Sequence, residues 1–221
     1  VSPLESTPGL SPIPTTYTGS RSSATDDGIF ATAQWADGGF SLSWDIVEAG
    51  GIFTYVYTFG GTAIDDKDLS HWLLEVSDTF TADNILDGSD ASLVDPTTYD
   101  SGGPGNSNPG IPGSIYAVKF DSGTAGGNYS YTIVTDRAPM WGSFYAKDGV
   151  DGGTDVIAYN TGFGTFPLEG VSDFTAWIAV PNTLGTPPGD DPVIPEPGTL
   201  ALFGTGLLGL GLWRHRRQQG N

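Results

Sequence analysis

Apolar and polar residues alternate along two neighbouring runs of the chain. In residues 40–46 (FSLSWDI) every second residue is apolar, and serine or aspartate stands between. Residues 52–59 (IFTYVYTF) are β-branched or aromatic throughout. A period of two is typical of a strand with one buried face. Because Gly50 and Gly51 suit a tight turn between the runs, we expect an antiparallel hairpin over residues 40–59.

The rest of the pattern predicts more short strands separated by glycine-rich turns. These strands are expected at Trp72–Val76, Ile115–Phe120, Tyr129–Thr135, Trp141–Ala146, Asp155–Tyr159 and Phe174–Val180. Short helical turns are expected at Asp65–Leu69 and Thr81–Leu86, the second capped by Asp83. Residues 95–113 are predicted to be a long loop. Many short strands favour an all-β domain of the β-sandwich or jelly-roll type.

Composition divides the chain into four parts. Residues 1–27 are rich in Pro, Ser and Thr and are predicted to be an extended lead-in. Residues 28–180 form the predicted β-sandwich domain, with a proline- and glycine-rich linker at 181–194 and a tail at 195–221. The chain has 221 residues, of which 12% are aromatic, so we expect a packed core. It has no cysteine, which excludes disulfides and thiol catalysis.

The charge of the chain is strongly negative. Its formal net charge is −18, and the part before Pro195 holds 25 acidic and five basic residues, a net charge of −20. Such a field repels phosphate backbones, so nucleic acid is excluded as an expected partner. It suits a solvated surface or a cation-rich matrix.

The tail contains an apolar span followed by basic residues. Residues 199–213 carry no charge, and Arg214, Arg216 and Arg217 follow. As a helix, fifteen residues reach about 22 Å, short of the roughly 30 Å hydrocarbon core, a gap that snorkelling arginines can close. We therefore predict an apolar helix in the inner membrane, its basic end cytoplasmic and the body outside.

Three features of the tail occur in a characteristic order. Pro195, Glu196 and Pro197 precede the apolar span, and the arginine cluster ends it. This arrangement resembles the PEP-CTERM sorting signal of exported proteins in Gram-negative bacteria. The resemblance implies recognition of the Pro-Glu-Pro triad by an exosortase, which removes the tail. It also implies an extracellular or outer-surface location in organisms that form biofilms and secrete exopolysaccharide.

One acidic cluster is a candidate metal site. Asp148, Asp151 and Asp155 lie along a glycine-rich stretch, and calcium prefers several hard oxygen ligands on a chain that can wrap around it. The spacing matches neither the EF-hand nor the glycine-rich nonapeptide repeat. Calcium is thus the one cofactor candidate, and a solvated acidic turn is the alternative.

Candidates for catalysis and for sugar stacking are weaker. His71 beside Ser70 suggests a hydrolase triad, but no Gly-x-Ser-x-Gly elbow accompanies it. Glu48 and Glu75 could form a carboxylate pair for glycoside hydrolysis only if the fold brought them together. Aromatic rings on a sheet can stack on sugars when they face outward, although more often they fill the core. The rings in question are Tyr55, Tyr57, Tyr129, Tyr131 and Trp177.

These observations lead to one leading hypothesis and two alternatives. We expect a non-enzymatic structural or adhesive protein of the cell surface or extracellular matrix. It would act through self-association, including strand addition at exposed sheet edges, or through contact with exopolysaccharide. The alternatives are a carbohydrate-binding module and a secreted hydrolase. Fold class cannot separate the three, because β-sandwiches host all of them.

Overall fold

The computed structural model describes residues 18–24, 27–37, 39–61, 69–102, 108–121, 129–167 and 173–181. In these ranges nearly all regular structure is β, so the all-β prediction is confirmed, whereas the finer sandwich or jelly-roll class stays a prediction. The elements are β1 Thr18–Ser22, β2 Ile29–Ala31, α1 Ala33–Asp37, β3 Ser41–Ala49, β4 Ile52–Gly60, β5 His71–Glu75, a 3₁₀ turn Ala82–Asn84, β6 Leu93–Tyr99, β7 Ile115–Phe120, β8 Ser130–Thr135, β9 Pro139–Gly142, β10 Phe144–Asp151, β11 Thr154–Asn160 and β12 Ile178–Pro181.

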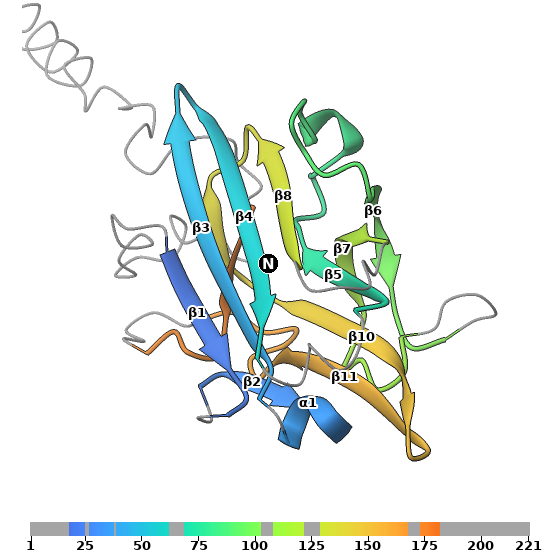
Figure 1. Ribbon diagram of the computed structural model, residues 1–221. Helices are drawn as coiled ribbons and strands as arrows, with labels where there is room; N and C mark the ends of the chain where they lie inside the picture. Colours follow the sequence, from blue (N-terminus) through green and yellow to red (C-terminus); the bar gives the residue numbers. More distant parts are fainter. Residues whose placement is uncertain are drawn as a thin grey trace, which may run out of the picture. The chain divides into compact units, whose positions relative to one another are not determined.

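The strands form three sheets (Figure 1). One has four strands in the order β1-β3-β4-β8, and another has six in the order β2-β11-β10-β5-β7-β6. Strands β9 and β12 make a separate two-stranded sheet. All pairings within the sheets are antiparallel.

The hairpin predicted from the alternating pattern is confirmed. Strands β3 and β4 pair along their whole length, from Ser41 opposite Gly60 to Ala49 opposite Ile52. The alternate apolar side chains of both strands are buried, and the side chains between them are partly or fully exposed. The hydrophobic period therefore set the register, because a one-residue slip would expose every buried ring.

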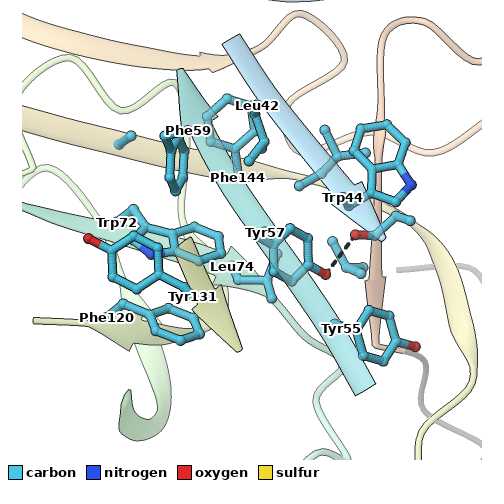
Figure 2. Close-up of a cluster of buried hydrophobic side chains, with 14 of the residues drawn as sticks. Leu42, Trp44, Tyr55, Tyr57, Phe59, Trp72, Leu74, Phe120, Tyr131 and Phe144 are labelled. Atoms are coloured by element: carbon cyan, nitrogen blue, oxygen red, sulfur yellow. Dashed lines mark hydrogen bonds between the residues drawn. The ribbon is translucent and has the colours of Figure 1, made fainter. Parts of the chain in front are cut away.

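The four-stranded and six-stranded sheets bury their inner faces in one shared core (Figure 2). Trp72 of β5 is fully buried and stacks on Phe120 of β7, with 4.4 Å between ring centroids. From the other sheet, Tyr57 and Phe59 meet Trp72 edge-on at 5.3 and 5.0 Å. Offset and edge-on contacts of this kind add stability beyond area burial.

The prediction of one strand over Trp141–Ala146 is wrong. The chain leaves β9 at Gly142 and enters β10 at Phe144, so Ser143 is the point where it changes sheets. At this break the backbone N–H groups bond to buried polar side chains. The Asn160 side chain accepts a hydrogen bond from the Phe144 backbone N–H at 2.8 Å, and Ser143 N–H donates to the Glu75 carboxylate.

Regular structure also occurs where the sequence predicted an irregular chain. Residues 18–22 of the expected lead-in form β1, which pairs with β3. Strand β6 extends into the predicted 95–113 loop and pairs with β7 around a register shift between Val94 and Thr97. A proline in β6 hid this strand from the pattern, because proline is tolerated only in edge strands or at bulges.

Two smaller boundaries also differ from expectation. The last strand begins at Ile178 rather than Phe174, because residues 174–177 form a turn closed by a hydrogen bond from Trp177 N–H to the Phe174 carbonyl. Residues 82–84 do form a helical turn, but its N-cap is Thr81 and not Asp83. The turn expected at Asp65–Leu69 falls almost entirely outside the described residues.

Candidate functional site

His71, the hydrolase candidate, is a buried group that fastens a loop. Its Nε2 lies 2.8 Å from Asn108 Oδ1, and the Asn108 amide donates to the Asp100 carbonyl. Burial lowers the pKa of His71 below its usual 6.5, and the nearby Lys119 and Lys147 lower it further, whereas the hydrogen bond that the ring donates to Asn108 Oδ1 raises it. Ser70, next to it in the chain, is exposed and uses its backbone N–H in the sheet. His71 and Ser70 therefore make contacts that hold the loop and the sheet in place.

The two glutamates suggested as a catalytic pair lie in different sheets. Glu48 is exposed near the end of β3 and accepts a hydrogen bond from Gly51 N–H, which closes the hairpin turn. Glu75 is buried on β5, where its Oε2 accepts from Ser143 N–H at 2.7 Å. Burial raises the pKa of Glu75, against the hydrogen bonds from Ser143. Each carboxylate thus has its own structural partner.

The aspartates of the calcium candidate lie on the β10–β11 hairpin. Its turn is Gly152-Gly153, both with positive φ, as a two-residue type I′ turn requires. Asp155 lies opposite Val150, so by strand alternation it and Asp151 point to opposite faces of the hairpin. The three carboxylates are therefore not gathered. In the part of the chain that the structure describes, no group of three or more acidic or histidine side chains is placed to hold a metal ion, and calcium binding stays a prediction.

The tyrosines proposed as sugar-stacking rings lie inside the core. Tyr55 and Tyr57 are fully buried, and their hydroxyls donate to the carbonyls of Arg137 and Ala179. Tyr129 and Tyr131 are also buried. Trp177 is half-buried, and its indole N–H donates to the Thr165 carbonyl. The expectation that such rings fill the core is confirmed for the tyrosines.

A different set of rings faces outward. Phe30 of β2 is 45% exposed and stacks on Tyr159 of β11 with 4.9 Å between ring centroids. Phe163, in the turn after β11, meets Tyr159 edge-on at 6.0 Å. We call these three residues the aromatic platform. The sequence predicted the strand that carries Tyr159 but not its outward face, and the three-residue β2 is too short to show a period.

A loop covers the sheet face beside the aromatic platform. Tyr145, opposite Tyr159 in the register, is fully buried, and its hydroxyl donates to the Pro109 carbonyl at 2.7 Å. Ile111 and Gly110 complete the cover; a Cβ on Gly110 would lie 2.6 Å from the Ile157 side chain. The loop thus covers Tyr145 and Ile157 on this face of the sheet and leaves the aromatic platform uncovered.

The comparisons with known proteins concern the tail. Residues 193–217 match the PEP-CTERM protein-sorting motif, which includes Pro195, Glu196, Pro197, Arg214, Arg216 and Arg217. These residues, and the apolar helix predicted for the tail, lie outside the described residues. Within the described part of the chain, no helix has the length and apolar character needed to cross a bilayer. No curated protein and no solved structure matches the chain.

Proposed function

The PEP-CTERM motif marks this chain as an exosortase substrate, exported and sorted to the surface of a Gram-negative cell, and from that premise we propose that its body is a non-enzymatic adhesive protein. It contacts neutral polysaccharide of the extracellular matrix through the aromatic platform. The exosortase removes the tail, and the all-β body, of β-sandwich type, remains as the functional unit.

The stacking of Phe30 on Tyr159 is the observation that supports polysaccharide contact. Single exposed apolar side chains are ordinary, but here one exposed ring is held by a second and bordered by a third. The carbon–hydrogen faces of a pyranose ring pack well on such a surface. Asp155 is exposed on the same side of β11, four residues from Tyr159 and beyond the covered Ile157, so its carboxylate can accept hydrogen bonds from another sugar unit of a polymer that extends along the strand.

The charge of the body favours a neutral polymer over an anionic one. The part before Pro195 carries a net charge of −20, so uronate- or sulfate-bearing chains are repelled over the range of a Debye length. A neutral polysaccharide meets no such barrier. Electrostatic selection of this kind acts on partner choice more than on raw affinity.

The engagement of the buried polar groups supports a non-enzymatic body. His71 holds Asn108, and Glu75 holds Ser143, so both side chains serve the packing of strands and loops. A catalytic acid or base must instead reach a bound substrate. The hydrolase alternative gains no observation from this arrangement.

Strand addition, the other route considered for assembly, receives little support from two sheet edges. Residues 86–90 cover the free edge of β8, where Leu86 N–H donates to the Val134 carbonyl and Ser89 Oγ accepts from Val134 N–H. Edge strand β6 contains Pro96 and a register shift. Prolines and bulges are common devices that protect an edge against pairing with another chain.

Binding of the full chain to an array of neutral and anionic polysaccharides tests this proposal. We expect signals on neutral β- or α-linked glycans and none on alginate or other polyuronates at low salt. An array blank for every neutral glycan would overturn the proposal, and binding confined to anionic chains would contradict its charge argument.

A further inference from the structure

The outward face of the four-stranded sheet carries a row of hydroxyl groups. In the register, Ser20 lies opposite Ser43, Ser43 opposite Thr58, and Thr58 opposite Ser130, so the row crosses β1, β3, β4 and β8 (Figure 1). The neighbouring positions in each strand point inward to the core. We call the outward side chains of these four strands the hydroxyl face.

The hydroxyls of this row bond largely within the sheet. Ser43 Oγ donates to the Thr58 carbonyl at 3.2 Å, and Thr58 Oγ1 lies 3.4 Å from Ser130 Oγ. The face therefore presents short, internally bonded side chains with few long ones to immobilise. At its hairpin end it also exposes apolar surface, because Val47 is 59% and Ile52 37% exposed. Both features suit close packing against another flat sheet, which normally lies about 10 Å away.

The hydroxyl face is poor in charge, although the body is highly charged. Asp45 is the one charged residue among the outward positions of β1, β3, β4 and β8. The part of the chain before Pro195 has a net charge of −20, so two copies repel each other in most orientations. Contact through this face brings only the Asp45 carboxylates of its strands together. Residues 86–90 cover the free edge of β8, so strand addition is blocked there, whereas face-to-face packing does not use that edge.

We propose that the hydroxyl face is a self-association surface, on which the same face of a second copy packs. A two-fold arrangement satisfies this contact, because one patch then serves both partners. The inference goes beyond polysaccharide contact and does not depend on it. If both hold, pairing gives an assembly with two aromatic platforms, able to join two polysaccharide chains.

Sedimentation velocity of the full chain over a protein concentration series tests the proposal. We expect reversible dimers whose association strengthens as NaCl rises from about 50 to about 500 mM, because salt screens the repulsion between the two bodies. The Debye length falls from about 14 Å to about 4 Å over this range. Thr58→Glu places a carboxylate in the centre of the face and should raise the dissociation constant by about tenfold or more. The matched control, Thr98→Glu, adds the same charge at an exposed position of β6 and should leave the constant within about twofold.

Two outcomes would overturn the inference. The first is a monomeric wild type at every concentration and salt; if polysaccharide binding were then lost in Thr58→Glu, the face would be assigned to a glycan. The second is equal weakening of the dimer by Thr58→Glu and Thr98→Glu, which would assign the effect to net charge. Far-UV circular dichroism and cooperative urea unfolding check that both variants fold.

Discussion

The Glu75 carboxylate accepts a 2.7 Å hydrogen bond from the Ser143 backbone N–H, and Glu75 N–H donates to the Ser143 carbonyl at 2.9 Å. Ser143 is where the chain passes from β9 to β10, and its Oγ accepts from Gly164 N–H. The buried pair therefore ties β5, the β9–β10 junction and the turn after β11 together. Burial raises the pKa of Glu75, because a charged carboxylate is less well solvated in the fold than in water.

Glu75→Gln should change how stability depends on pH. A raised folded-state pKa means that the contribution of Glu75 is fully present below about pH 4.5 and is lost as pH rises through the folded pKa. Glutamine keeps a neutral acceptor for Ser143 N–H. The variant should therefore gain stability relative to wild type as pH rises from 4 to 8, measured by urea unfolding. Glu48→Gln, at an exposed site, is the control; a difference between Glu75→Gln and wild type that stays constant with pH would contradict the prediction.

His71→Gln should have the opposite dependence. Burial lowers the pKa of His71, so its contribution is present above pH 6.5 and is lost as pH falls through the folded pKa. Lys119 and Lys147 disfavour the charged ring further, and Asp121 opposes them. Wild type should lose thermal stability relative to His71→Gln between pH 7.5 and 5. A difference in melting temperature between the two proteins that stays constant over this range would count against the prediction. The second histidine, His215, is present in both proteins, so its titration does not contribute to the difference.

Arg21→Lys should loosen the chain around residues 173–177. The Arg21 guanidinium donates to the carbonyls of Trp177 and Phe174 at 3.0 and 2.7 Å and lies 5.1 Å from the Trp44 ring centroid. A lysine ammonium cannot reproduce this planar, forked contact. We expect a loss of about 1–3 kcal/mol in the free energy of unfolding, with faster amide exchange at Trp177. Exchange in the β3–β4 hairpin serves as the internal reference, and uniform acceleration would indicate a different cause.

Trp72→Ala should be the most damaging of these substitutions. The ring is fully buried between the two sheets, and its removal leaves a large cavity beside Phe120, Tyr57 and Phe59. Comparable truncations cost about 3–5 kcal/mol. Val150→Ala, at a position 59% exposed, should stay within about 0.5 kcal/mol of wild type. Similar urea midpoints for the two variants would refute the shared core.

The sequence predicted those parts of the fold where one face of a strand is buried. The β3–β4 hairpin and β7 were found because their apolar residues alternate or cluster without interruption. It did not predict the break at Ser143, because that break depends on Glu75 and Asn160, which are distant in the chain. Strand β6 was missed because Pro96 and a bulge disrupt its pattern.

The candidate surfaces were harder to predict than the fold. A period of two says that alternate side chains share a face, but it does not say which face meets water. The aromatic platform joins Phe30 to Tyr159 across 129 positions of the chain, a contact that only the β2–β11 pairing creates. The sorting motif, in contrast, is written in consecutive residues, and the family comparison confirmed it.

Retention of the full chain on an insoluble neutral glucan, compared between wild type, Phe30→Ala, Tyr159→Ala and Val94→Ala, tests the proposed function most directly. Val94 is 42% exposed on β6 and provides a matched apolar truncation away from the aromatic platform. The proposal predicts about tenfold weaker retention for each ring variant, as expected for residues central to a contact. Val94→Ala should be retained as strongly as wild type. Equal retention of all four proteins would contradict polysaccharide contact through the platform.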